Sequence, residues 1–375
     1  MEAYLEPIKI ALLVFPFIAF LITLPYLMFQ YHKFGAVPLL RSVIVYTFIL
    51  YLISAYFLVI LPLPSKAAVA AMPTKVPQLI PFQFIGDIIS KVDIVWNDWH
   101  SYLSVFQQPT VYTILFNLLL TFPFGVYLRY YFQKKWYQVL LYTFGLSLFF
   151  EITQLTGLYG IYPKAYRLFD VDDLLMNTAG GMLGFLSTPL LTKLLPSRQA
   201  LDETSYRKGQ QVSIYRRGVA FLIDVFCFSV MTTLLTILFL HVDFTIVVAI
   251  TGAIYYILLP MLSKGRTIGK MIVKLQVTTE KKPHWLYIAM RQVLLYGIIL
   301  PAPYWLARLT NIHGNSIFSF LGLFLFFLLL CYYLLFWIQL IKRLLGGKKN
   351  FSYEKLTKTA VTSTIIVENN SRQEN

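Results

Sequence analysis

The sequence predicts an all-α polytopic membrane protein with about nine transmembrane helices in two bundles. Three observations carry this prediction. Of the 375 residues, 58% are hydrophobic and only 13% are charged, which is too apolar for a water-soluble core. Several apolar runs reach the roughly 20 residues that a helix needs to cross a bilayer. These runs do not alternate with polar residues as barrel strands would, so helices are the spanning elements.

Nine apolar segments are long enough to cross. In chain order they are 8–30, 42–62, 111–129, 136–157, 174–191, 218–240, 244–262, 285–306 and 317–340. The first follows a segment without the basic residues of a signal peptide, so we expect it to be retained. The eighth is the weakest, because Arg291, Pro301 and Pro303 interrupt it, and we expect it to lie partly in the membrane interface.

The distribution of charge predicts the orientation in the membrane. Lysine and arginine total 32 against 17 aspartate and glutamate, a formal net charge of +15. The basic residues gather in alternate loops, whereas the long loop at 63–110 holds no cationic excess. The positive-inside rule therefore places the N-terminus outside and the C-terminus in the cytoplasm. The excess positive charge is explained by the orientation in the membrane and by contact with anionic lipid. Nucleic acid is not an expected partner.

A polar stretch divides the chain. Residues 192–215 have no span-forming hydrophobicity and mark a domain boundary. We therefore expect a transmembrane domain at 1–195, a cytoplasmic linker at 196–214 and a second transmembrane domain at 215–345. The polar residues at 346–375 predict a flexible C-terminal tail.

Charged and amide side chains gather at one end of the fourth and fifth spans. Glu151 and Gln154 lie three residues apart and therefore share a helix face. An ionisable group at membrane depth costs roughly 2.5–3.5 kcal/mol to insert and usually faces protein or a watery cavity. We name the whole set the outer cluster, for its predicted side, and expect it to line a polar binding pocket. Its members are Glu151, Gln154, Arg167, Asp170, Asp172, Asp173 and Asn177.

Part of the outer cluster also has a purely structural interpretation. If a helix begins near Val171, Asp170 would cap it, and the two acidic residues that follow would suit the positive end of its dipole. Glu151 would then pair with Arg167 and lock the hairpin. This interpretation does not explain why Glu151 and two amide side chains reach the same membrane depth. A binding site accounts better for the whole set.

The spacing of these residues forms a specific set of motifs. They read E-x-x-Q, R-x-x-D-x-D-D and N-x-x-G-G-x-x-G, and NLLLTFPFG precedes them. In this pattern the chain resembles the VanZ-like family of bacterial membrane proteins over roughly residues 13–191. The resemblance implies an envelope protein, and the founding member of the family is linked to low-level teicoplanin resistance. It also singles out supporting residues outside the cluster, namely Asn117, Gly180, Gly181 and Gly184.

A second charged set lies in the C-terminal half. Arg217 and Asp224 are seven residues apart, two helical turns, so they share a face of the sixth span. Asp224 lies deeper and needs a partner, for which Arg291 is the candidate. The stretch GRTIGKMIVKLQV is no Walker A loop, because only three residues separate Gly265 from Gly269. We expect these glycines to form a turn, followed by a short strand or amphipathic segment.

Together with Thr267 and Lys270, this set resembles the RDD family of membrane proteins over about residues 209–344. A further aspartate of that family has no counterpart after the loop, where Glu280 is the nearest acidic residue. A simpler interpretation stays open for the individual residues of this set. Arg217 and Lys270 also fit a role as positive-inside anchors, and a pair of Asp224 with Arg291 also fits a structural role.

The sequence predicts neither a metal site nor a catalytic arrangement. Cys227 and Cys331 lie inside apolar runs, where a thiol usually acts as a small core residue. No Ser/His/Asp or Cys/His arrangement is recognisable, and no cofactor is assigned. The histidines are scattered without the spacing of metal ligands: His32, His100, His241, His284 and His313.

Three functions follow from these patterns. The leading one is a cell-envelope protein of the bacterial plasma membrane that lowers susceptibility to lipoglycopeptides such as teicoplanin. Its expected partners are membrane lipid and a lipid-linked envelope precursor or the lipoglycopeptide itself. The alternatives are a metal-dependent enzyme acting on a lipid-linked envelope substrate, and an ion or small-solute transporter. A transporter would be expected to show broken spans or internal repeats, and neither is recognisable in the sequence.

Overall fold

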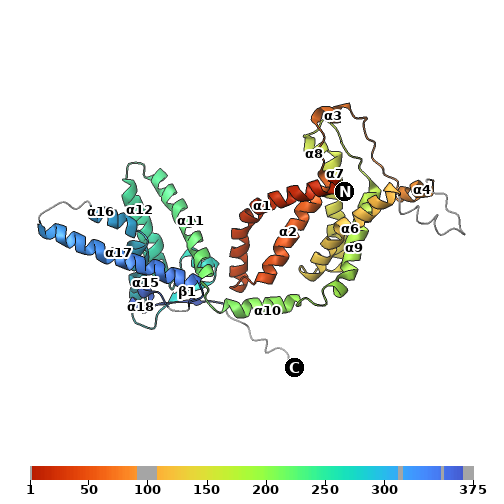
Figure 1. The fold of residues 1–375 in the computed structure, drawn as a ribbon. Helices are drawn as coiled ribbons and strands as arrows, with labels where there is room; N and C mark the ends of the chain where they lie inside the picture. The colour runs from red at the N-terminus through yellow and green to blue at the C-terminus, as the bar shows by residue number, and fades with distance from the viewer. Residues whose placement is uncertain (1, 91–107, 311–315, 348–349, 366–375) are drawn as a thin grey trace, which may run out of the picture. The chain divides into compact units, whose positions relative to one another are not determined.

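The computed structural model describes residues 2–90, 108–310, 316–347 and 350–365. This part of the chain is helical almost throughout and contains one two-stranded antiparallel sheet (Figure 1). Eight of its helices are long and apolar enough to cross a membrane, or nine elements if one bent pair of helices counts as a span. The predicted class, an all-α membrane protein with about nine spans, is confirmed.

Contacts within the chain divide it into two compact units. The first unit comprises Met1–Ile22 and Pro38–Leu201, and the second comprises Thr23–Val37 and Asp202–Asn375. The long helix α1 (Glu2–Phe34) therefore contributes its first part to one unit and its last part to the other. The polar stretch of the sequence contains the later division point and forms α10.

The first unit is a bundle of spans joined by short helices. After the first part of α1, its spans are α2 (Leu39–Ile60), α6 (Pro109–Tyr130), α7 (Trp136–Leu155) and α9 (Val171–Leu191). The connections hold α3 (Lys66–Ala71), α4 (Gln83–Ile89) and α8 (Gly157–Gly160), and α10 (Arg198–Gly209) follows α9. Phe124, Leu128 and Val139 form a buried cluster between α6 and α7.

Glycines set the distance between α6 and α9. A Cβ atom on Gly125 would lie 1.8 Å from the carbonyl oxygen of Gly181, and one on Gly184 would lie 2.0 Å from that of Phe122. No side chain fits at these positions. The two helices therefore pack backbone against backbone, the arrangement that small residues permit in membranes.

The second unit contains four further spanning elements, one of them bent. They are α11 (Ile214–Leu238), then α12 (Phe244–Gly252) with η1 (Ala253–Leu258) and α13 (Leu259–Leu262), then α15 (His284–Gln292) with η2 (Val293–Ile299) and α16 (Ala302–Thr310), and finally α17 (Ser316–Leu344). The helices before and after residues 300–301 meet at 58°. This bend falls at Pro301, because proline cannot continue the helical hydrogen bonds. It corrects the expectation of a chain without broken spans.

The segment after α17 is folded. It contains α18 (Ser352–Leu356) and β2 (Ala360–Ser363), which pairs antiparallel with β1 (Leu275–Thr278). The prediction of a flexible tail at 346–375 is therefore wrong for these two elements, because Tyr353 of α18 and Val361 of β2 are buried rather than solvated. The part of that prediction at 366–375 lies outside the described residues.

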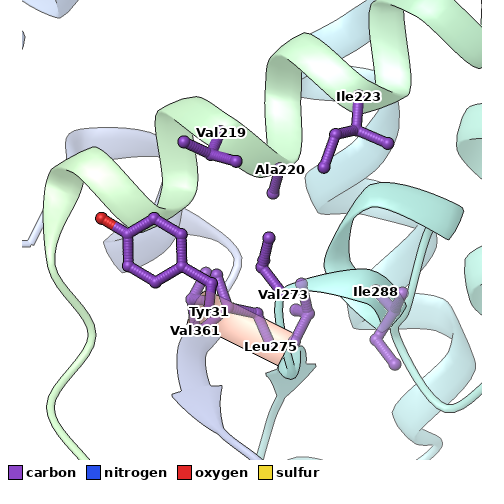
Figure 2. Close-up of a cluster of buried hydrophobic side chains, with 9 residues drawn as sticks. Tyr31, Val219, Ala220, Ile223, Val273, Leu275, Ile288 and Val361 are labelled. Atoms are coloured by element: carbon purple, nitrogen blue, oxygen red, sulfur yellow. The ribbon is translucent and has the colours of Figure 1, made fainter. Parts of the chain in front are cut away.

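A hydrophobic cluster packs the sheet against α11 (Figure 2). The helix α14 (Ile268–Ile272) leads into β1 beside it. Tyr31 comes from α1 and Val361 from β2, so this core draws on both ends of the sequence. Its buried members are Tyr31, Val219, Ala220, Ile223, Val273, Leu275, Val277, Ile288 and Val361.

Candidate functional site

Glu151 is buried near the end of α7, with 3% of its surface exposed. Its carboxylate accepts a hydrogen bond from the backbone N–H of Asp170 at 3.0 Å. Arg167 makes no direct contact with this carboxylate, because its guanidinium donates to the Leu61 carbonyl oxygen at 2.8 Å, so its charge acts on Glu151 only from a distance. In the described part of the chain no ion pair joins Glu151 to Arg167. The structural alternative for this pair is therefore wrong.

Asp173 and Asn177 lie one turn apart on α9, next to α6 and α7. The Asp173 carboxylate accepts a hydrogen bond from the Asn117 side-chain amide of α6. Asn177 is buried and donates through Nδ2 to the Ser147 hydroxyl of α7 at 2.9 Å. Its Oδ1 has no hydrogen-bond donor among the described residues. Polar groups of three spans thus meet at this end of the bundle.

Three carboxylates of the outer cluster accept hydrogen bonds only from neutral side chains or backbone N–H groups. Those of Glu151, Asp170 and Asp173 lie close enough to repel one another. Burial raises the pKa of the Asp170 carboxyl, and the negative charges of Asp172 and Asp87 add to the rise. Such a group of like charges favours protons or a positively charged ligand.

The arrangement of these acids does not form a metal cage. Within the described residues, no group of three or more His, Cys, Asp or Glu side chains is arranged to hold a metal ion. His100 and His313 lie outside those residues, so the prediction that they bind no metal is not tested by the structure. The outer cluster therefore offers single carboxylates rather than a ligand set.

Gln154 and Arg167 cap the C-terminal end of α2. The carbonyl oxygens of residues 59–61 have no partners within the helix, and three side chains donate to them. Gln154 donates at 3.1 Å, the Tyr166 hydroxyl at 3.1 Å and Arg167 at 2.8 Å. These two members of the outer cluster thus hold α2 against α7 and the loop before α9.

Asp172 anchors the loop that carries α4. Its buried carboxylate accepts hydrogen bonds from the backbone N–H of Phe82 at 2.5 Å and of Phe84 at 3.0 Å. The Gln78 amide donates to it at 3.3 Å. Asp170 has the predicted role of N-cap, because its side chain accepts from the Asp172 N–H at 2.8 Å. These contacts assign Asp172 a structural role.

Replacing Asp172 by alanine is expected to release this loop. The change removes three hydrogen bonds to a buried carboxylate, which are worth about 1.5–3 kcal/mol each at most. Limited trypsin digestion of the purified protein should show faster cleavage after Lys75, which is exposed in the loop. The control is Asp87→Ala in the same loop, and equal cleavage rates in both variants would contradict the anchoring role.

The buried Asp224 carboxylate of α11 is held by the loop around α14. Four groups surround it: the Gly269 N–H at 2.7 Å, the Tyr255 hydroxyl at 2.8 Å, the Thr267 hydroxyl at 2.6 Å and the Lys270 ammonium at 3.9 Å. Burial lowers the pKa of Lys270 to about 8, although the Asp224 charge opposes this shift. Three of the four partners belong to the loop motif seen in the sequence.

Arg291 is not the partner of Asp224, and that prediction is wrong. Arg291 forms an ion pair with Glu354 at 3.3 Å and donates to the Thr359 hydroxyl at 3.1 Å. Its guanidinium also lies 4.9 Å from the centre of the Tyr353 ring. All three partners of Arg291 follow α17, in the segment that was expected to be flexible. The sequence therefore offered no reason to pair Arg291 with them.

Comparison with known protein families assigns each of these two sites to a domain. The VanZ/LLP1 family matches residues 48–192, and the RDD family matches residues 212–346. The chain is a fusion of a VanZ-like domain and an RDD domain. No curated protein and no solved structure matches it significantly. The outer cluster lies in the VanZ-like domain, and the Asp224 network lies in the RDD domain.

Glu354 is the hub of a second network that packs on the RDD domain. Its buried carboxylate forms ion pairs with Arg217 at 2.7 Å, Arg291 at 3.3 Å and Arg343 at 3.4 Å. Burial alone would raise the pKa of Glu354, but Arg217 and Arg291 hold it below its ordinary value. One carboxylate faces three cations, so positive charge is left in excess.

Sequence reasoning singled out Arg217 and missed its neighbour Arg216. Arg216 is fully buried and donates to the carbonyl oxygens of Gly209, Val273 and Lys274, each at 2.7 Å. It therefore joins the end of α10 and the connection between α14 and β1 to the start of α11. The available signal was the Arg-Arg pair itself, because neighbouring helical residues point about 100° apart and need different partners.

The two glycines of the RDD loop have different reasons to be glycine. Gly265 has a φ of +82°, and a Cβ there would lie 2.2 Å from the Val277 carbonyl oxygen. Gly269 lies inside α14, where a Cβ would lie 2.1 Å from the Ala220 carbonyl oxygen. The predicted turn is confirmed for Gly265 and wrong for Gly269, which permits close packing of α14 on α11.

Proposed function

We propose that this chain is a bacterial plasma-membrane protein whose VanZ-like domain binds the positively charged part of an envelope ligand at the outer leaflet. Binding at the outer cluster would lower susceptibility to lipoglycopeptides such as teicoplanin. One observation carries the proposal. Glu151 and Asp173 are carboxylates at membrane depth, and their hydrogen-bond donors are a backbone N–H and a neutral amide.

The energetic argument concerns the lack of a cation bonded directly to these carboxylates, since Arg167 acts on both only from a distance. A buried carboxylate is costly unless a cation or several donors offset its desolvation. Each of these two carboxylates has one donor, and the Oδ1 of Asn177 nearby has none among the described residues. A ligand ammonium would supply charge-assisted hydrogen bonds to the carboxylates, and an N–H of the ligand would serve Asn177.

The choice of ligand rests on position and on family. The positive-inside rule places the outer cluster on the external side, where lipid-linked precursors and lipid-tailed glycopeptides are exposed. The VanZ-like domain adds an argument by analogy. A metal-dependent enzyme has less support, because the described residues bring no three His, Cys, Asp or Glu side chains together as metal ligands. For a transporter, the bend at Pro301 is the supporting feature.

The test is growth inhibition by teicoplanin and vancomycin in a deletion strain. The strain is complemented with wild type, Glu151→Gln, Asp173→Asn or Arg167→Ala at matched membrane abundance. We expect both carboxylate variants to lose protection against teicoplanin and to leave vancomycin sensitivity unchanged. Arg167→Ala should also lose protection against teicoplanin. This change removes the hydrogen bond that holds the end of α2, and the outer cluster should then be displaced.

The matched control is Glu203→Gln, which makes the same chemical change at an exposed position of α10. It should protect as well as wild type does. If the carboxylate variants also protect fully, the outer cluster is structural or serves another ligand. Equal loss for teicoplanin and vancomycin would argue for general envelope damage and against a lipid-tailed ligand.

A further inference from the structure

The RDD domain contains a cavity of about 750 Å³, which no part of the proposed function uses. We call it the RDD cavity. Its volume lies in the range of roughly 300–1,000 Å³ that is typical of small-molecule sites. Most of its wall is apolar and comes from α11, η2 and α17. Five of these wall residues are Leu222, Leu295, Phe336, Trp337 and Leu340.

One end of the RDD cavity is cationic. Arg217, Lys270 and Arg291 line the cavity together with Asp224, and Arg343 lies beside them on Glu354. Against these four cations stand two carboxylates, Asp224 paired with Lys270 and Glu354 shared by the three arginines. Two positive charges are therefore left over next to an apolar wall. A ligand that suits both surfaces has an anionic head and a hydrocarbon tail.

The cavity lies at the ends of two spans, the level at which lipid head groups are expected. Its wall includes the first turns of α11, from Ile214 onward, and the last turns of α17, up to Leu344. Both are ends of spans, and the last turn of α17 contains Lys342 and Arg343. The cavity is also lined by Tyr215 and Trp337, which are 63% and 43% exposed. Aromatic residues of this kind mark the membrane interface.

We propose that the RDD cavity binds one anionic phospholipid. The phosphate lies at the end lined by Arg217, Lys270 and Arg291, and one acyl chain lies along the apolar wall. Guanidinium and ammonium groups bind phosphate through charge-assisted hydrogen bonds. A zwitterionic lipid fits less well, because its own ammonium would face the excess positive charge. Five side chains of the cluster in Figure 2 also line the cavity, namely Tyr31, Val219, Ala220, Leu275 and Val361.

Gly218 offers a way to fill the cavity without touching its charges. It lines the cavity on the exposed side of α11, and a Cβ added there would meet nothing within 4 Å. Gly218→Leu therefore places a side chain in the space of the acyl chain and improves helix propensity. The matched control is Gly145→Leu, an exposed glycine of α7 where a Cβ also meets nothing within 4 Å.

The experiment measures lipid binding to the purified full chain in detergent micelles by native mass spectrometry. The probes are phosphatidylglycerol, phosphatidylcholine with the same acyl chains, and free glycerol phosphate. We expect phosphatidylglycerol to bind at least about tenfold more tightly than either other probe. Gly218→Leu should lose about tenfold of this affinity, and Gly145→Leu should lose none.

Three results would overturn the proposal. Equal binding of phosphatidylcholine would mean that the cationic end does not select the lipid. Equal binding of glycerol phosphate would identify a site for soluble phosphate. Unchanged affinity in Gly218→Leu would place the bound lipid elsewhere on the protein. The antibiotic test addresses the other domain, so either proposal can fail without the other.

Discussion

Replacing Glu354 by glutamine is expected to destabilise the RDD domain by about 3–5 kcal/mol, the range found when one partner of a buried ion pair is removed. The variant leaves Arg217, Arg291 and Arg343 without their shared carboxylate. Thermal unfolding of the purified protein in detergent micelles should show the loss as a lower midpoint. Trypsin should also release the segment containing α18 and β2 more rapidly.

The control for this prediction is Glu280→Gln, which makes the same change at an exposed position. It should unfold at the wild-type midpoint. Acid provides a second readout. Because the pKa of Glu354 in the folded protein lies below its ordinary value of 4.5, its stabilising charge is fully present above that pH and is lost as the pH falls further. Identical acid curves for wild type and Glu354→Gln would rule out this role.

Replacing Gly184 by leucine is expected to destabilise the VanZ-like domain by about 3 kcal/mol or more, at or above the usual range for overpacking. The nearest atom to the new Cβ would be the Phe122 carbonyl oxygen at 2.0 Å, and backbone cannot move aside as a flexible side chain does. α6 and α9 must separate, which also breaks the contact between Asn117 and Asp173. A lower unfolding midpoint and lost teicoplanin protection should therefore appear together.

Gly145→Leu is the matched control for Gly184→Leu, because the same side chain enters open space on α7. It should keep both the midpoint and the protection. An unfolding midpoint for Gly184→Leu equal to that of wild type would mean that α6 and α9 tolerate a wider separation. In that case the glycines would not determine the geometry of the outer cluster.

Local rules made the start of α9 predictable. A polar acceptor, Asp170, stands directly before an apolar run, and the helix begins at Val171 with that side chain as its cap. The same local rules could not predict the partners of Asp172. They are the backbone N–H groups of Phe82 and Phe84, and any residue type can supply such a donor. Spacing therefore identified the members of the cluster but not their individual contacts.

Long-range pairing of charges was the harder problem. Asp224 needed a partner at membrane depth, and Arg291 was the candidate because it lies within the eighth predicted span. Arg291 instead pairs with Glu354, which lies 63 residues further along the chain, in a segment whose composition is polar. Its neighbours Phe351 and Tyr353 are nevertheless buried. A short amphipathic segment that packs on a membrane domain has too few apolar residues to differ from a solvated tail.

The shared core of Tyr31 and Val361 affects the order in which this protein is assembled during synthesis. Tyr31 precedes the VanZ/LLP1 match, and Val361 follows the RDD match, yet both lie in one buried cluster. During synthesis α1 is therefore inserted long before β1 and β2 exist. The last part of α1 can complete its packing against the sheet only after Val361 has been translated. An RDD fragment cut at its family boundaries would lack both residues. Separating the two halves of the gene would thus impair the second protein even where the cut itself spares every residue between 212 and 346.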